Sequence, residues 1–271
     1  MIPKIIHYCW FGSGKMPKLA KKCIKSWKRY CPDYEIKEWN ENNFDVNIIP
    51  YVQEAYRVKK YAFVSDYARF WILYHYGGLY FDTDVEMVKP IDGIISRGSF
   101  MGCENEVRDA HNAQYNDKEI LYVNPGLGLG CCSNLTLFRE ILDYYQNIHF
   151  INEDGTLNQH TVVEYTTNIL NRYGLKKTNG IQECAGITIY PKDFFCPLSW
   201  DDEPSKFTEN TVTIHHFAGS WLPLKNRLRI KHPYFAEKYP SIFHYCFFLP
   251  MYIRENYMEI IKRRIVKYMK K

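Results

Sequence analysis

The sequence predicts an α/β protein with a ligand site at the carboxyl edge of its sheet. Near the start of the chain, a strand, a helix and a second strand follow one another, with a glycine-bearing turn at 10–14. Farther on, a helix over Lys60–Tyr76 stops at Gly77-Gly78 and leads directly into the short apolar strand Leu79–Phe81. Because α/β sheets bind ligands where their strands end, the residues after these strands are the first candidates for a site.

Apolar spacing and turn residues define the other elements in order. The first helix places Cys23 and Trp27 on one face and ends before Pro32. Helices are expected over Pro17–Tyr30, Lys60–Tyr76, Leu135–Gln146 and Gln159–Tyr173. Strands are expected over Lys4–Tyr8, Tyr34–Trp39, Leu79–Phe81, Val85–Val88, Phe100–Cys103, Leu127–Cys132 and Thr211–Phe217.

The positive charge of the chain lies at its end. The 271 residues carry a formal net charge of +5, yet residues 262–271 alone hold six basic side chains and no acidic one. The rest of the chain is therefore near neutral, which argues against a nucleic-acid partner. We expect one catalytic domain over 1–240 and a basic amphipathic helical tail over 241–271.

Cysteine usage and the absence of a leader pattern indicate the compartment. The nine cysteines form no C-x-x-C pair, and their odd number in a chain of this size predicts free thiols. The first residues show no signal-peptide pattern, and the longest apolar stretch is too short to span a membrane. We expect a cytoplasmic protein.

The main chemical motif is Asp82-Thr83-Asp84, directly after the strand Leu79–Phe81. In an extended segment, residues two apart point the same way, so the two carboxylates can face one point. Such a pair suits Mg²⁺ or Mn²⁺, with substrate phosphates completing the coordination. A lone D-x-D is common in surface turns, but the preceding apolar strand places this one at a sheet edge.

The helix before this motif carries an acid and a base on an otherwise apolar face. Asp66 and Arg69 are three residues apart and share that face with Ala62 and Leu73. One interpretation is a buried ion pair that ties the helix to the sheet. In the other, Asp66 accepts hydrogen bonds from ligand hydroxyls and Arg69 donates to phosphate or sugar oxygens.

The third candidate segment is His215-His216-Phe217-Ala218-Gly219-Ser220-Trp221. Only one of two adjacent histidines on a strand can face a given side, and a neutral imidazole beside two carboxylates is a plausible third metal ligand. Gly219-Ser220 lets the backbone approach an anion, and Trp221 offers an N–H donor.

Together these segments resemble the D-x-D sugar transferases of glycosyltransferase family 32, with a more distant likeness to large clostridial glucosylating toxins. The resemblance rests on Pro3–Gly12, on Ser65–Arg69 continuing through Gly77–Asp84, and on His215–Trp221. It implies a GT-A fold, a Rossmann-like mixed sheet flanked by helices with a C-terminal helical extension. It also implies a nucleotide-sugar donor and a divalent ion, Mn²⁺ or Mg²⁺.

The resemblance also implies roles for individual residues. Trp10 matches the position that stacks on the nucleotide base, and Ser65, Asp66, Arg69 and Tyr80 match contacts to ribose and donor sugar. Asp82 and Asp84 match the metal and diphosphate pair, and Gly219, Ser220 and Trp221 match contacts to the β-phosphate. His216 matches the late metal ligand, with His215 as the alternative. The catalytic set is thus Asp66, Arg69, Asp82 and Asp84.

The function implied is transfer of a hexose to a glycan or lipid-linked oligosaccharide in surface polysaccharide synthesis, such as capsule or lipopolysaccharide, with retention of configuration. A UDP-sugar is the first expected donor and GDP-mannose the second. One alternative is a phosphatase of the haloacid-dehalogenase type, because Phe81–Val85 also fits its nucleophile motif. Another is a non-catalytic sugar-nucleotide-binding protein.

The basic tail suggests where the enzyme acts. Tyr252–Lys271 is predicted to form a helix with apolar side chains on one face and the basic cluster on the other. Such a helix can lie on an anionic membrane surface, and a solvated terminal helix is an equal alternative. Peripheral contact with the inner face of the plasma membrane is therefore an expectation.

Overall fold

The computed structural model describes residues 1–107, 121–198, 205 and 207–219. The chain divides into two units, one of Met1–Ser199 with Glu203–Phe217 and the other of Trp200–Asp202 with Ala218–Lys271. All the helices and strands named below belong to the first unit. The predicted boundary at residue 240 and the helical tail over 241–271 lie outside the described residues.

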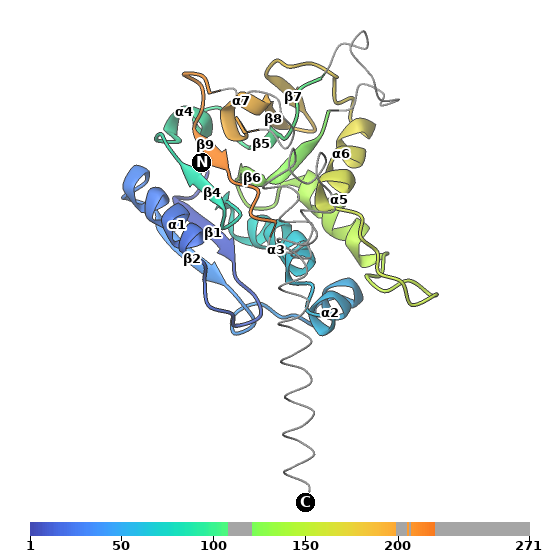
Figure 1. Ribbon diagram of the computed structural model, residues 1–271. Coiled ribbons are helices and arrows are strands. Elements are labelled where there is room, and N and C mark those ends of the chain that lie inside the picture. Colours follow the sequence, from blue (N-terminus) through green and yellow to red (C-terminus); the bar gives the residue numbers. More distant parts are fainter. Residues whose placement is uncertain (108–120, 199–204, 206, 220–271) are drawn as a thin grey trace, which may run out of the picture. The chain divides into compact units, whose positions relative to one another are not determined.

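A seven-stranded mixed sheet, in the order β2-β1-β3-β6-β5-β8-β7, forms the centre of the first unit (Figure 1). Strands β2, β1 and β3 are parallel, whereas β6 runs antiparallel to both of its neighbours, β3 and β5. The strands are β1 (Ile5–Cys9), β2 (Glu35–Trp39), β3 (Gly78–Tyr80), β5 (Phe100–Cys103), β6 (Val123–Cys131), β7 (Gln182–Cys184) and β8 (Ile187–Tyr190). The predicted α/β class, with a mixed sheet flanked by helices, is confirmed.

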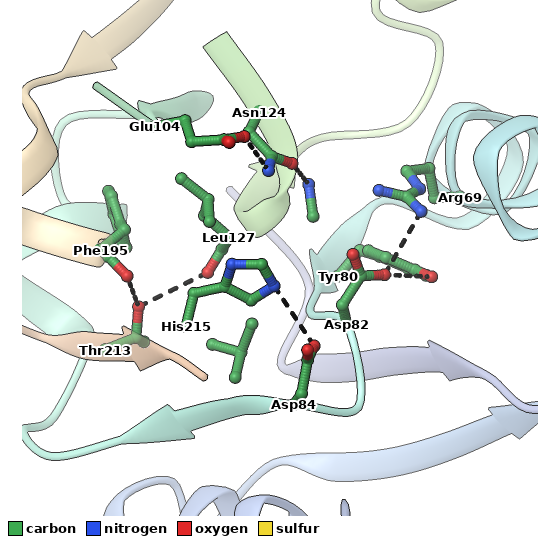
Figure 2. Close-up of polar contacts among 12 residues, drawn as sticks. Arg69, Tyr80, Asp82, Asp84, Glu104, Asn124, Leu127, Phe195, Thr213 and His215 are labelled. Carbon is green, nitrogen blue, oxygen red and sulfur yellow. Dashed lines mark hydrogen bonds and ion pairs between the residues drawn. The ribbon is translucent and has the colours of Figure 1, made fainter. Parts of the chain in front are cut away.

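A small second sheet joins β4 (Val85–Met87) to β9 (Thr213–His215) in antiparallel register. Val85 stands opposite His215, so the strand that follows the D-x-D motif is paired with the late histidine segment. The hydroxyl of Thr213 donates to the carbonyl of Phe195 at 3.2 Å, which fixes β9 from its other side (Figure 2). Two motifs about 130 residues apart are thereby brought to one place.

Helices cover both faces of the large sheet. Alternation along β3 divides the core, because Tyr80 packs into one apolar cluster while Leu79 packs into the other. The first cluster includes buried side chains of α2 (Pro50–Arg57), α3 (Tyr61–Tyr76), α5 (Thr136–Gln146) and α6 (Val162–Arg172). The second includes those of α1 (Lys18–Tyr30), α4 (Asp92–Ile95) and α7 (Lys192–Phe195).

Most predicted elements are confirmed to within a few residues. The strand predicted over Leu127–Cys132 begins earlier, at Val123, and its first part was missed because it contains Asn124 and Pro125, which do not indicate a strand. A Cβ added at Gly130 would overlap the ring of Phe100, so the close packing there requires glycine. The predicted helix from Gln159 begins later, at Val162, after a capping box formed by Thr161 and Glu164.

Two further findings concern membrane-spanning helices and cysteines. Across the ranges the structure describes, no helix combines the length and apolar character needed to cross a membrane. The eight cysteines in those ranges are free thiols, as predicted. Cys246 lies outside them.

Candidate functional site

Asp82 and Asp84 follow β3 at the point where the chain leaves the large sheet. The amide of Asp82 donates to the carbonyl of Gly126 on β6 at 3.0 Å, and the amide of Val85 donates back to the carbonyl of Asp82 at 3.0 Å. This turn releases the chain from the large sheet into β4. Figure 2 shows the two carboxylates along this segment, with side chains from α3, β6 and β9 around them.

Arg69, on α3, connects the helix to the motif. Its Nη2 lies 2.8 Å from Asp66 Oδ1 and 3.3 Å from Asp82 Oδ1 (Figure 2 draws the second contact). Its Nε donates to the carbonyl of Ser65 at 3.2 Å, and its guanidinium lies 5.0 Å from the ring centre of Tyr80. Nη1 is buried and has no hydrogen-bond partner among the described residues, so one donor of the fork remains for a ligand.

The buried acids of the site are harder to ionise than exposed ones. Burial raises the pKa of Asp66 to about 7, even though Arg69 favours its charged form. Burial also raises the pKa of Asp82, and the Asp84 carboxylate adds to this effect against the pull of Arg69. The hydroxyl of Tyr80 donates to Asp82 Oδ1 at 3.2 Å. The ion pair expected between Asp66 and Arg69 therefore exists, and it is part of the D-x-D site.

The two late histidines point in different directions, as alternation along a strand requires. His215 Nε2 lies 3.4 Å from Asp84 Oδ1, whereas His216 Nε2 lies 2.8 Å from Glu86 Oε2. Glu86 is in turn paired with Lys22 at 2.7 Å. The assignment of His216 as metal ligand is thus not what the side-chain geometry favours, and the alternative, His215, lies beside the motif.

The environment of His215 is buried and polar. Burial alone would lower its pKa, but the carboxylate of Asp84 raises the pKa well above its usual value. Its Nδ1 is buried without a hydrogen-bond partner among the residues described. Like Arg69, His215 keeps a polar atom that nothing in this part of the chain satisfies.

Strand β6 contributes residues that the sequence analysis missed. Asn124 donates from its amide nitrogen to Glu104 at 2.7 Å, and its Oδ1 accepts from the amide of Gly126 at 2.7 Å (Figure 2). A Cβ added at Gly126 would overlap Asp82 Oδ2. The glycines at 126, 128 and 130 could have indicated a strand that another part of the chain approaches closely. Only the antiparallel pairing of β6 with β3 shows that Asp82 approaches it at Gly126.

The turn after β1 holds Trp10. Its indole N–H donates to the carbonyl of Gly14 at 2.7 Å, and its backbone amide donates to Trp39 at 2.8 Å. The carboxylate of Glu41 accepts from the amide of Gly12 at 3.2 Å and from the hydroxyl of Ser13 at 2.8 Å. Gly12 has φ +89°, a conformation that favours glycine. Trp10 is half-buried, and these hydrogen bonds hold the turn around it in one conformation.

The remaining predicted positions are placed as follows. Ser65 lies on α3 one turn before Arg69, and its hydroxyl donates to the carbonyl of Tyr61 at 3.1 Å. Gly219 has φ +55° and belongs to the second unit. Ser220 and Trp221 lie outside the described residues. The predicted β-phosphate contacts therefore stay predictions.

The acidic residues fit a divalent ion that is bound together with a substrate. No group of three His, Cys, Asp or Glu side chains in the described ranges converges closely enough to hold a metal ion alone. Two carboxylates, Asp82 and Asp84, lie beside an unsatisfied imidazole and an unsatisfied guanidinium nitrogen. Mg²⁺ and related ions are commonly held by one or two carboxylates plus substrate phosphates, and this donor set matches that pattern.

Comparison with known proteins identifies the class of this region. Residues 17–101 match the family described as a glycosyltransferase sugar-binding region containing a DXD motif. This stretch contains α3, Asp66, Arg69 and both aspartates of the motif. The resemblance to D-x-D sugar transferases predicted from the sequence is confirmed, and the match favours the transferase interpretation over the phosphatase alternative.

Individual relatives that match part of this chain are also glycosyltransferases. Inositol phosphoceramide mannosyltransferase 1 of Schizosaccharomyces pombe is 32% identical over 111 residues, which are 37% of this chain and 33% of that protein. The initiation-specific alpha-1,6-mannosyltransferase of Candida albicans is 30% identical over 36% of this chain and 28% of that protein. The uncharacterized glycosyltransferase L373 of Acanthamoeba polyphaga mimivirus is 34% identical over 37% of this chain and 42% of that protein. Each match spans less than half of the relative's length.

Among solved structures, the PaToxG glycosyltransferase aligns with a TM-score of 0.45 at 19% identity, over 63% of this chain and 69% of that one. The galactosyltransferase LgtC, solved with donor and acceptor sugar analogues, aligns with a TM-score of 0.42 at 14% identity, over 83% of this chain and 94% of that one.

Proposed function

We propose that this protein transfers a hexose from a nucleotide sugar to a hydroxyl of a glycan acceptor, in a reaction that requires a divalent ion. The observation that carries the proposal is the meeting of Asp82, Asp84, Arg69 and His215 at one sheet edge, in a region that matches D-x-D glycosyltransferases. Cleavage of a sugar–diphosphate bond places negative charge on the leaving phosphate. Arg69 and a divalent ion held by the two carboxylates would supply the positive charge that stabilises it.

Each residue has a role in that proposal. Asp82 and Asp84 would hold Mn²⁺ or Mg²⁺ together with diphosphate oxygens, and the bound ion would act as a Lewis acid on the departing phosphate. Arg69 presents its free Nη1 to a phosphate or sugar oxygen. His215, which faces Asp84, is the better candidate for a third protein ligand than His216, which faces Glu86.

Residues around this centre would bind the rest of the donor. Trp10 stacks on the base from its fixed turn, and Ser65, Asp66 and Tyr80 lie toward the ribose and sugar. The family resemblance also implies contacts to the β-phosphate from Gly219, Ser220 and Trp221, and these stay part of the proposal. The printed names of several relatives concern transfer of mannose, which favours a mannosyl donor such as GDP-mannose more than the sequence alone did. UDP-hexoses stay in the proposal as the alternative donors.

The transfer retains the configuration at the anomeric carbon. Among the described residues, no carboxylate pair stands out as nucleophile and acid in the manner of glycosidases, so the acceptor hydroxyl attacks from the face that the leaving group vacates. The leaving phosphate then takes the proton of that hydroxyl. NMR of the newly formed linkage measures this, and an inverted anomer would contradict front-face transfer.

The acceptor is a glycan of surface polysaccharide synthesis, carried on a lipid or free. The basic tail over 262–271 would hold the enzyme at an anionic membrane, close to a lipid-linked acceptor. Co-sedimentation with vesicles rich in phosphatidylserine tests this part. Truncation after Ile261 should abolish sedimentation and leave nucleotide-sugar turnover unchanged, and sedimentation of the truncated chain would contradict it.

Nucleotide release tests the proposed function itself. GDP-mannose, UDP-glucose and UDP-galactose are each incubated with the protein, with Mn²⁺ or with EDTA, and release of the nucleoside diphosphate is measured. We expect turnover of at least one donor with Mn²⁺ and none with EDTA. Asp84→Ala should abolish the turnover, whereas Asp143→Ala, an exposed aspartate paired with Arg139, should not.

Two outcomes would contradict the proposal. If no donor is turned over, the protein is a sugar-nucleotide-binding protein or acts on another class of substrate. If Asp84→Ala retains the Mn²⁺-dependent turnover, the site lies elsewhere.

A further inference from the structure

A cavity of about 600 Å³ lies where the chain enters β6 and beside α5 and α6. Its wall includes Tyr122 from the chain just before β6, Tyr144 from α5, and Asn168 and Asn171 from α6. None of these residues belongs to the D-x-D site. The cavity is large enough for a ligand the size of an oligosaccharide segment.

The side chains that line this cavity are suited to a sugar. Tyr122 and Tyr144 line the cavity, and each residue keeps 36% of its surface exposed. Asn168 and Asn171 are one helical turn apart on the exposed side of α6. Their side-chain amide groups form no hydrogen bond with any other described residue. Aromatic rings and free amides together bind the apolar faces and the hydroxyls of a sugar ring.

The charges of the cavity argue against a nucleotide or an acidic ligand. Lys177 is balanced by Glu164 in the same wall. Glu164 is already engaged, because its carboxylate accepts from the amide of Thr161 at 2.7 Å and lies 3.5 Å from His160. An uncharged, hydroxyl-rich ligand therefore fits this cavity better than a diphosphate does.

The cavity is connected to the D-x-D site through one strand. Tyr122 lies two residues before Asn124, and both contact Glu104: the carbonyl of Tyr122 accepts from the Glu104 amide at 2.8 Å, and the Glu104 carboxylate accepts from the Asn124 side chain at 2.7 Å. Asn124 and Gly126 lie at the D-x-D site, where Gly126 abuts Asp82. Four residues of chain span at most about 14 Å, so Tyr122 lies within a short oligosaccharide's length of Gly126, which abuts Asp82.

From these observations we infer that the cavity binds an inner segment of an oligosaccharide acceptor, whose terminal hydroxyl reacts at the D-x-D site. The inference rests on the proposed transfer function. It adds an uncharged oligosaccharide as the acceptor class and Tyr122, Tyr144, Asn168 and Asn171 as the residues that bind it. The donor site and this cavity would then be occupied at the same time.

Binding of defined oligosaccharides tests this inference separately from catalysis. Saturation-transfer difference NMR is recorded on the full chain with α-1,6-mannotriose, maltotriose and lactose, in the presence of Mn²⁺ and the nucleoside diphosphate of the active donor. We expect a signal from at least one sugar. The double variant Tyr122→Ala/Asn168→Ala should weaken that binding about tenfold or more, since it removes one stacking ring and one hydrogen-bonding amide.

Two further variants keep the test decisive. Asn168→Trp adds bulk at an exposed helix position and should block the cavity even if the double variant folds poorly. Phe207→Ala removes another exposed aromatic ring, 54% accessible and outside the cavity, and should leave sugar binding unchanged. All cavity variants should retain nucleotide release from the donor in the absence of acceptor.

The results separate the two proposals. If no sugar binds the wild type, or if binding is unchanged in the double variant and in Asn168→Trp, the cavity is not the acceptor site. If the wild type binds a trisaccharide through this cavity but turns over no nucleotide sugar, the cavity inference stands as a glycan site and the proposed transferase function fails.

Discussion

His7 and the D-x-D site both have buried polar atoms, on adjacent strands of one sheet. They differ in whether those atoms have hydrogen-bond partners within the fold. His7 on β1 stands opposite Tyr80 on β3 and is completely buried. Its Nδ1 accepts from the indole N–H of Trp39 at 3.0 Å, and its Nε2 donates to the carbonyl of Gly77 at 3.0 Å. Both ring nitrogens are satisfied within the fold.

The D-x-D site leaves donors unsatisfied. Nη1 of Arg69 and Nδ1 of His215 are buried with no hydrogen-bond partner in the described part of the chain. An unpaired buried polar group costs about 1–3 kcal/mol, and a ligand that accepted hydrogen bonds from these two donors would recover that cost. The comparison indicates that both nitrogens of His7 serve the fold, whereas the two open nitrogens beside Asp82 and Asp84 are available to a ligand.

The largest effect is expected from Arg69→Lys. This change keeps the positive charge but removes the planar fork that joins Asp66, Asp82 and the unpaired nitrogen. We expect nucleotide release to fall about a hundredfold or more, with the thermal unfolding transition still cooperative. A folded Arg69→Lys protein with near wild-type turnover would show that the open nitrogen has no role in the reaction.

Gly126→Ala tests whether the close approach of β6 to Asp82 matters. The added methyl group would overlap Asp82 Oδ2 and displace that carboxylate, so the KM for Mn²⁺ should rise about tenfold or more in a nucleotide-release assay. Gly93→Ala is the matched control, because a Cβ there meets nothing within 4 Å. Equal behaviour of the two variants would mean that Asp82 is free to shift without consequence.

Variants of the two histidines test which of them is the metal ligand: His215, which the geometry favours, or His216, which the family resemblance implies. His215→Ala should raise the KM for Mn²⁺ about tenfold or more, because His215 lies beside Asp84, whereas His216→Ala should change it much less. Titration of Mn²⁺ in the nucleotide-release assay measures both. The opposite order would favour His216 as the ligand, as the resemblance implies, and would require its side chain to leave Glu86.

The smallest effect on activity is expected from substitution of His7. The substitution should instead change how the free energy of unfolding depends on pH. Burial lowers the pKa of His7 to about 4, below its ordinary value of 6.5, so the folded state binds fewer protons than the unfolded state between these pH values. The stability that His7 contributes is present above pH 6.5 and is lost as pH falls toward 4. The loss is on the order of 3 kcal/mol.

His7→Gln should remove this part of the pH dependence, measured by urea unfolding between pH 7 and pH 4.5. Its specific activity at neutral pH should stay near that of the wild type. His75→Gln, at the exposed end of α3, is the control and should keep the wild-type slope. An unchanged slope in His7→Gln would show that His7 is not a buried neutral group.

Local patterns in the sequence predicted much of this architecture. The helix now seen at Tyr61–Tyr76, its stop at Gly77 and the aspartates after β3 were all expected, because periodicity and turn residues act over a few positions. The proximity of Asp66 and Arg69 followed from helical spacing. Their contact with Asp82 did not, because it depends on how α3 packs against β3.

Long-range pairing decided the rest of the site. The pairing of Val85 with His215 determines that His215, and not His216, faces Asp84. The antiparallel entry of β6 brings Asn124 and Gly126 to the motif from about 40 residues away in sequence. A hydrophobic pattern shows which residues form strands but not which strands are neighbours, so neither fact was available from the sequence.

Binding of Mn²⁺ measured by electron paramagnetic resonance tests the central claim most directly, that the D-x-D site is completed by a ligand. The wild type and Asp84→Asn are titrated with Mn²⁺, each with and without the nucleoside diphosphate of the active donor. The wild type should bind Mn²⁺ strongly only when the nucleotide is present, and Asp84→Asn should not bind it in either case. Equal nucleotide-dependent binding of Mn²⁺ by Asp84→Asn would contradict the claim.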